Sequence, residues 1–267
     1  MPFFVHDSLE FHYRDEGAGI PFVFQHGLGN DLSQPFELFR ATECIRLLAF
    51  DCRGHGATRP LGDIAKLSIE SFADDLVAFL NHQEIATADV GGTSMGAAVA
   101  LNFALRYPER VRRLVLSRPA WLDRADPKNL RVLGTVARLL REQGPDAGRL
   151  MFQNTEDYRE LVRESPASAE SVLGLFGRSN PEETAVVLER IPMSRPCTSL
   201  SDLRSIEVPT LVLANRLDPI HPMDYAVQLV ASIPRSTLHE VTPRSVSIEQ
   251  HRAEIHGHLA EFLQPSA

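Results

Sequence analysis

Short apolar runs alternate along the chain with longer segments whose apolar residues recur at helical spacing. The runs that predict strands cover residues 21–25, 45–51, 88–92, 111–117, 209–214 and 236–241. Near-continuous apolar runs are typical of parallel strands buried on both faces of a sheet. The segments that predict helices cover residues 69–83, 96–108 and 223–234. This alternation indicates an α/β protein with a mainly parallel sheet.

Two regions depart from this alternation. Residues 3–17 alternate apolar and polar positions, which predicts an antiparallel hairpin at the sheet edge. Residues 121–200 hold no convincing strand, and their helix-like pieces are punctuated by proline and glycine. We expect a core domain of about eight strands from residues 1–120 and 201–267, with residues 121–200 inserted as a helical cap.

Composition narrows the class of protein. The chain has 267 residues, of which 43% are hydrophobic, and this is enough for one large core plus a subdomain. A net charge of −8 argues against nucleic acid or an anionic membrane as a partner. The three cysteines, Cys44, Cys52 and Cys197, lack paired spacing and indicate reduced thiols in the cytoplasm. No apolar run is long enough to span a bilayer, and residues 1–17 carry charges where a signal peptide is apolar.

The clearest chemical motif is a serine flanked by glycines between a predicted strand and a predicted helix. Gly92-Thr93-Ser94-Met95-Gly96 has the form G-x-S-x-G, in which the serine occupies a strained turn and the glycines relieve crowding. The helix N-terminus behind Ser94 favours negative charge on a reacting oxygen. We therefore expect Ser94 to be a nucleophile, the alternative being a tight turn that happens to contain serine.

An earlier strand is followed by His26-Gly27-Leu28-Gly29, which would let the backbone turn close to Ser94. The backbone N–H groups of Leu28 and Met95 then form a candidate oxyanion hole. We interpret His26 as structural, because a histidine at a strand end more often bonds nearby backbone than takes part in catalysis.

Together the motifs resemble those of α/β-hydrolase fold proteins, in particular serine-nucleophile esterases and lactonases with a helical cap. The matching stretches are HGLG, FDCRGHGAT, GGTSMG, FALRYPERVRRLVLS and VPTLVLANRLDPIHP, in the family's order. They extend over nearly the whole chain except the insertion. The resemblance implies a Ser…Asp…His triad in that chain order and no cofactor. It also implies that Asp51, Arg53 and His55 form a structured turn beside the site, a substrate contact being the alternative.

The candidate acid is Asp218, just past the strand predicted at residues 209–214. A carboxylate there can orient an imidazole and stabilise its protonated form. The alternative is a turn or helix-cap role before Pro219. Asp202 is a weaker rival because it precedes that strand. His221 shares a short turn with Asp218, and we interpret it as part of the pocket rim.

The expected base is less clear. Most relatives carry Gly-His shortly after the last strand, where this chain reads TPRSVS with Arg244 in place of a histidine. Arginine stays protonated and cannot act as a base. His251 is the nearest downstream histidine, and a longer loop would carry it over Ser94. His256 and His258 fall within the predicted closing helix. We expect His251 to be the base, and another histidine or an incomplete triad stays open.

These residues predict a serine hydrolase that cleaves a small ester, thioester or lactone with an apolar portion. We expect Trp121, Phe152, Phe176 and His221 to contact the substrate, although the aromatic residues of the insertion fit its own core equally well. Carbon–carbon bond hydrolysis or perhydrolysis on the same residues is an alternative, as is a ligand-binding receptor that has lost turnover. We expect a small-molecule substrate, no metal, no cofactor, no nucleic acid and no membrane, and the oligomeric state stays open.

Overall fold

The structure, a computed structural model, describes residues 2–264. Its eight strands form one sheet in the order β1-β2-β4-β3-β5-β6-β7-β8. The strands are β1 (Phe3–His6), β2 (Leu9–Glu16), β3 (Ile20–Gln25), β4 (Ile45–Phe50), β5 (Ala88–Thr93), β6 (Val111–Ser117), β7 (Thr210–Ala214) and β8 (Ser236–Glu240). β2 pairs antiparallel with β1 and β4, and the remaining neighbours are parallel. The predicted α/β class and eight-stranded sheet are confirmed.

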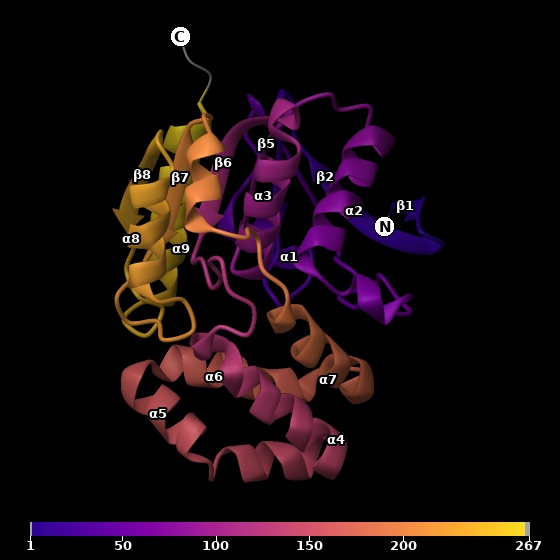
Figure 1. Ribbon diagram of the computed structural model, residues 1–267, viewed down its shortest axis with the longest axis vertical. Coiled ribbons are helices and arrows are strands. Elements are labelled where there is room, and N and C mark those ends of the chain that lie inside the picture. Colours follow the sequence, from indigo (N-terminus) through magenta and orange to yellow (C-terminus); the bar gives the residue numbers. More distant parts are fainter. Residues whose placement is uncertain (1, 265–267) are drawn as a thin grey trace.

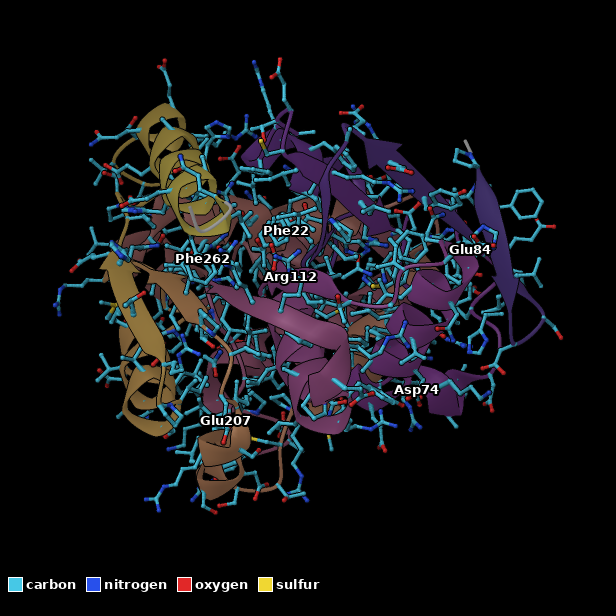
Figure 2. The ribbon with its side chains drawn as sticks, turned by 90° about the horizontal axis from the view of Figure 1, so that it is seen from above. Phe22, Asp74, Glu84, Arg112, Glu207 and Phe262 are labelled. Atoms are coloured by element: carbon cyan, nitrogen blue, oxygen red, sulfur yellow. The ribbon has the colours of Figure 1, made fainter. Side chains whose placement is uncertain are left out.

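Helices cover both faces of the sheet. Successive strand residues point to opposite faces, and apolar side chains on both faces need to be buried. One face packs on α2 (Ile69–His82), α3 (Met95–Arg106) and α8 (Met223–Ser232) through a cluster that includes Val23 and Leu48. The other face packs on α1 (Ser33–Leu38) and α9 (Ile248–Leu263) through a cluster that includes Phe22 and Leu47. In Figure 2, Phe22 lies in the interior of the side-chain layer, whereas Glu84 and Glu207 lie towards its outside.

Four helices separate β6 from β7 in the chain: α4 (Arg131–Phe152), α5 (Glu156–Glu164), α6 (Pro166–Gly174) and α7 (Pro181–Arg190). They gather as one layer beyond one end of the sheet, which we call the cap (Figure 1). The predicted helical insertion is therefore present. Its expected limits at residues 121 and 200 stay a prediction. Short 3-10 helices complete the structure at Ile64–Lys66, Pro108–Arg110, Lys128–Leu130, Leu175–Gly177, Ile191–Met193 and Leu200–Ser205.

Every predicted strand of the parallel sheet is found within one residue of its expected bounds, and the three predicted helices within two. The predicted hairpin at residues 3–17 is also confirmed. The sequence pattern missed α1, a six-residue helix that contains Pro35 and has no side-chain N-cap. In the part of the chain described here, no helix is long and apolar enough to cross a membrane, and the three cysteines are free thiols.

Candidate active site

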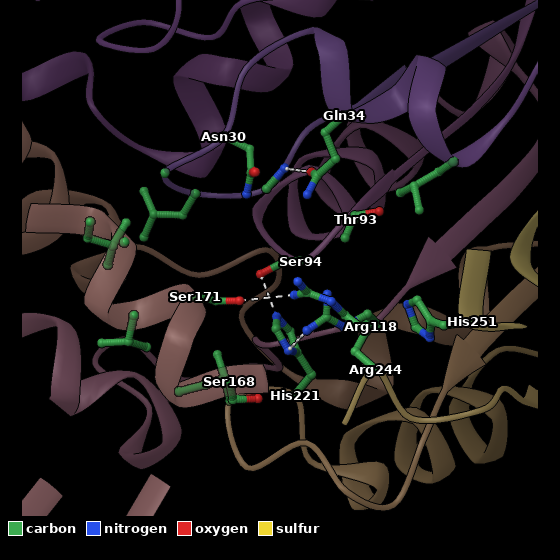
Figure 3. A pocket seen from close by; sticks show the side chains of 18 of the residues that line it. Asn30, Gln34, Thr93, Ser94, Arg118, Ser168, Ser171, His221, Arg244 and His251 are labelled. Atoms are coloured by element: carbon green, nitrogen blue, oxygen red, sulfur yellow. Dashed lines mark hydrogen bonds between the residues drawn. The ribbon is translucent and has the colours of Figure 1, made fainter. Parts of the chain in front are cut away.

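A pocket of about 390 Å³ opens at the carboxyl ends of the parallel strands, beneath the cap. Open α/β sheets bind ligands at this edge because the loops after several strands converge there. The pocket is lined from the core by residues that include Leu28, Gln34, Ser94, Arg118, His221, Arg244 and His251. It is lined from the cap by residues that include Leu133, Ser168, Ser171, Val172 and Leu175. Figure 3 shows polar groups from both sides facing this space.

Ser94 occupies a strained turn between β5 and α3. Its φ of 57° lies in the left-handed region that residues with a Cβ seldom adopt. The two flanking glycines are required by close approach. A Cβ on Gly92 would lie 2.3 Å from the carbonyl carbon of Gly96, and one on Gly96 would lie 2.2 Å from the carbonyl oxygen of Gln25. The two glycines therefore allow α3 to lie this close to β3 with a serine on the turn.

Backbone donors lie on both sides of Ser94. Leu28 lines the pocket from the loop after β3, and the Gly27 N–H in that loop donates to Gln34 Oε1 at 2.8 Å. Met95 begins α3, where the first N–H groups of a helix have no partner within it. Within residues 2–264, neither the Leu28 nor the Met95 N–H donates to a backbone carbonyl. Both N–H groups are therefore available as hydrogen-bond donors.

The imidazole that contacts Ser94 belongs to His221. Its Nε2 lies 2.9 Å from Ser94 Oγ, and its Nδ1 lies 2.9 Å from Asp218 Oδ1. A tight turn brings the acid and the histidine together: the His221 N–H donates to the Asp218 carbonyl at 3.1 Å, with Pro219 at the position that favours such turns. The predicted rim residue His221 is thus in direct contact with the predicted nucleophile and the predicted acid (Figure 3).

The tautomer of His221 follows from its neighbours. An ionised carboxylate only accepts hydrogen bonds, so contact with Asp218 requires the proton on Nδ1 and leaves the Nε2 lone pair facing the Ser94 hydroxyl. Arg118 follows β6, donates to Asp218 Oδ2 at 2.7 Å and also lies 3.1 Å from His221 Nδ1. That second contact is electrostatic, because Nδ1 already carries a proton. Ser168 of the cap donates to Asp218 Oδ1 at 3.2 Å.

Charge and burial keep Asp218 ionised and His221 neutral. Burial alone would raise the pKa of Asp218, but Arg118 and His221 hold it well below its ordinary value. Burial lowers the pKa of His221, the Asp218 carboxylate opposes this, and the Arg118 charge adds to the lowering. The group that contacts Ser94 is therefore a neutral imidazole at neutral pH, with the proton on Nδ1 and a free lone pair on Nε2, as a general base must have.

His251 lies elsewhere in the same pocket. We expected it on a loop, and this placement is corrected: Ser247 caps α9, which begins at Ile248, so His251 lies in the first helical turn. Its Nδ1 donates to the Thr242 carbonyl at 2.7 Å, and burial lowers its pKa to about 4. No hydrogen bond or ion pair joins His251 to Ser94 or Asp218 among the described side chains. His256 and His258 lie in α9 as expected.

Of the aromatic residues expected to contact substrate, Trp121 lines the pocket and is buried. Phe152 and Phe176 do not line it. Their rings pack against each other at 5.7 Å, and both side chains are buried in the cap. The arrangement favours the alternative that these two residues form the insertion's own core, because both rings are buried against each other and away from the pocket.

The segment after β4 has structural partners. Asp51 accepts from the Leu32 and Ala57 N–H groups at 2.7 and 2.8 Å. His26 accepts from the Cys52 N–H through Nε2 at 3.0 Å. His6, Asp7 and Asp75 are close enough together to hold a metal ion. Both carboxylates of that group already pair with Arg53, so the arrangement is explained as an ion-pair network.

Three interactions at the site were not predicted from the sequence. They are the contact of His221 with Ser94, the ion pair of Arg118 with Asp218, and the hydrogen bond from the Gly27 N–H to Gln34. A signal for the first existed, because the Gly-His expected after β8 is missing while a histidine follows Asp218 by three residues. Arg118 and Gln34 carry no sequence signal. Both depend on which loops meet at the sheet edge.

Comparison with known proteins agrees with the observed fold. The model of the alpha/beta hydrolase fold family matches residues 20–244. A 2-hydroxy-6-oxo-2,4-heptadienoate hydrolase of Pseudomonas putida is 31% identical over 264 residues, which cover 93% of this chain and 91% of that protein. A 3-oxoadipate enol-lactonase of Acinetobacter baylyi is 27% identical over 241 residues, covering 88% and 85%.

Among solved structures, the enol-lactonase from Burkholderia xenovorans LB400 superposes with a TM-score of 0.75 at 25% identity, covering 98% of this chain and 99% of that one. The residues that match the family model include most of the sheet and the strained turn at Ser94. The chain therefore belongs to the α/β-hydrolase fold family and is a hydrolase of that family.

Proposed function

We propose that the chain hydrolyses a small carboxylic ester, thioester or lactone with an apolar portion through an acyl-enzyme. The observation that carries this proposal is the continuous contact from Ser94 Oγ to His221 Nε2 and from His221 Nδ1 to Asp218, each at 2.9 Å. A nucleophile within hydrogen-bond reach of a base, itself oriented by a third group, is the arrangement that covalent catalysis requires.

The steps follow from the atoms in contact. Ser94 Oγ attacks the carbonyl carbon while His221 Nε2 takes its proton, and Asp218 stabilises the resulting imidazolium. The Leu28 and Met95 N–H groups stabilise the oxyanion. The imidazolium then returns the proton to the departing oxygen or sulfur, leaving an acyl-Ser94. Water, deprotonated by the same Nε2, releases the acid and restores Ser94. In this mechanism His221 replaces His251, the base expected from the sequence.

A second reaction is supported by a specific comparison. The Pseudomonas putida relative at 31% identity bears the name of a hydrolase of an oxo-dienoate. The same residues support cleavage next to a ketone: water or Ser94 adds to the carbonyl, and the carbon–carbon bond breaks if the leaving carbanion is stabilised by conjugation. Product analysis with a vinylogous 1,5-diketone distinguishes this reaction from ester cleavage.

The test begins with covalent labelling. A fluorophosphonate should modify Ser94, and peptide mapping locates the label. We expect His221→Ala to lower kcat/KM by about four to six orders of magnitude, because loss of a triad base leaves only the oxyanion hole and binding. His251→Ala, the matched control in the same pocket, should keep the rate within about tenfold.

Two results would contradict the proposal. One is label on another serine of the folded protein. The other is the reverse ranking of the two histidine variants, which would restore His251 as the base. Far-UV circular dichroism of each variant establishes that the loss of rate is not a loss of fold.

A further inference from the structure

The charged residues that line the pocket differ in whether they have an oppositely charged partner. They are Glu37, Arg118, Arg244 and Arg252. Arg252 pairs with Glu37 at 2.7 Å, and Arg118 pairs with Asp218 at 2.7 Å. Across residues 2–264, no carboxylate oxygen lies within 4.0 Å of the Arg244 guanidinium. Its hydrogen-bond partner is the hydroxyl of Ser171 in the cap, at 3.0 Å.

Arg244 is in an environment that disfavours a lone cation. Burial lowers its pKa, and the charge of nearby Arg118 lowers it further, although an arginine stays protonated at neutral pH. The Asp218 and Glu170 carboxylates offset this lowering only in part, and neither contacts the guanidinium. A partly desolvated charge with no carboxylate in contact costs folding free energy, and a bound anion relieves this cost. The guanidinium presents a planar set of donors that matches a carboxylate in a bidentate arrangement.

The rest of the pocket limits what that anion can be. The cap wall carries apolar side chains that include Leu133, Val172 and Leu175, and Ser94 with His221 lies on the core side. A cavity of about 390 Å³ holds a small molecule and no polymer. Figure 3 shows Arg244 and Ser171 facing each other across the same space as the Ser94–His221 pair.

We propose that the substrate carries a carboxylate in addition to the carbonyl group that Ser94 attacks, and that Arg244 binds this carboxylate. This inference rests on the proposed function of Ser94 as the nucleophile. Arg244 takes no part in proton transfer. It selects small acyl compounds with a terminal negative charge over neutral ones of the same length.

The competing explanation is purely structural: Arg244 ties the loop after β8 to the cap through Ser171. The two explanations differ in which substitutions matter. Removing the Ser171 hydroxyl breaks the tie and keeps the cation, whereas Arg244→Gln removes the cation and keeps a hydrogen-bonding side chain. Ser171→Ala is therefore the matched control.

The kinetic test compares two substrates of equal length, the mono-4-nitrophenyl ester of glutaric acid and 4-nitrophenyl pentanoate. They differ in a terminal carboxylate against a terminal methyl group. Arg244→Gln should lower the ratio of kcat/KM for the glutarate ester to kcat/KM for the pentanoate ester by about 10- to 100-fold, given the strength of hydrogen bonds to charged groups. Ser171→Ala should leave the ratio of the two values unchanged.

A second measurement needs no turnover. On a Ser94→Ala background, calorimetry should detect glutarate binding, and adding Arg244→Gln should weaken it at least about tenfold, whereas adding Ser171→Ala should not. This arm stays readable even if no ester is cleaved, so it separates failure of the anion site from failure of the proposed reaction. Absence of glutarate binding, equal binding with Arg244→Gln, or an equal loss on both esters reproduced by Ser171→Ala would each overturn the assignment.

Discussion

At the scale of single residues, the site is a compact balance of charges. Asp218 accepts from Arg118 and from Ser168, and holds the Nδ1 proton of His221. Arg118 thereby does two things. It keeps the acid ionised in a buried position, and it disfavours a second positive charge on the neighbouring imidazole. The His221 imidazole is therefore neutral at neutral pH, and the positive charge of Arg118 makes its protonation less favourable.

Replacing Arg118 tests that balance. The acidic limb of the kcat/KM profile reports the pKa of the base in the free enzyme, and the base is active only when unprotonated. Burial and then Arg118 lower the pKa of His221, so the wild-type limb should lie below the ordinary value of 6.5. Arg118→Met removes a neighbouring positive charge, so protonation becomes easier and the limb should move to higher pH. Rates are normalised by fluorophosphonate titration of Ser94.

Arg118→Lys is the control for this experiment, because it keeps the charge beside Asp218 while losing the planar fork. Its limb should stay close to that of the wild type. A limb at the same pH in Arg118→Met and the wild type would mean that Arg118 does not influence the base.

At the scale of elements, the decisive unit is β5, the serine turn and α3. The turn is strained at Ser94 and is held because α3 packs against β3 and β5 with no room at Gly92 or Gly96. The stability of the element pair thus maintains the geometry of the nucleophile. The helix N-terminus adds a favourable field at the site where an oxyanion forms.

Adding a methyl group at Gly96 should break this arrangement. The new Cβ would lie 2.2 Å from a backbone oxygen of Gln25, which cannot rotate away. We expect Gly96→Ala to lower the free energy of unfolding by about 2–4 kcal/mol and to slow fluorophosphonate labelling of the remaining folded protein. Chemical denaturation and labelling rates measure the two effects.

The control is Gly257→Ala in α9, where an added Cβ meets nothing within 4 Å. It should raise the free energy of unfolding by about 0.5–1 kcal/mol, because alanine favours a helix over glycine. Equal behaviour of the two variants would remove the packing explanation of the motif.

Sequence patterns predicted elements better than they predicted contacts between elements. The parallel strands were predictable because burial on both faces leaves near-continuous apolar runs, as in β6. Ser94 was predictable because its strained turn demands glycines at fixed spacing. The histidine that contacts Ser94 was not predictable, because it depends on which loop approaches Ser94 in space. His251 was expected on a loop, but the Ser247 cap begins α9 before it. The Asp218–His221 turn instead carries the imidazole to the nucleophile.

At the scale of the whole molecule, the sheet contains a buried carboxyl group that takes no part in the proposed reaction. Asp89 lies on the central strand β5, fully buried, with no hydrogen-bond partner for either carboxylate oxygen among the described residues. Arg113 is 3.8 Å away and Arg112 is 4.0 Å away. Burial raises the pKa of Asp89 to about 6, and the two arginines offset this only in part.

The sign of the resulting pH dependence is definite. A carboxyl whose pKa is higher in the folded protein is easier to bury when protonated, so its ionisation costs stability as pH rises from about 4 to above 6. Asp89→Asn should therefore raise the free energy of unfolding at pH 8 by about 1–3 kcal/mol and change it little at pH 4.

Urea denaturation at the two pH values measures this difference. The exposed Asp146→Asn removes the same charge from α4 and should show no comparable gain. An Asp89→Asn variant that is no more stable than the wild type at pH 8 would show that the two arginines compensate the buried charge in full.

The Asp218–His221 turn has a consequence for how this chain can diversify. In the proposed mechanism the acid and the base lie on one short connection after β7, and the connection between β8 and α9 takes no part in proton transfer. Under selection, codon changes or small insertions around Arg244 can then alter ligand preference while the reaction itself persists. A combinatorial library confined to residues 242–247 should accordingly yield many active clones with shifted preferences, whereas one confined to residues 215–221 should yield few active clones of any preference.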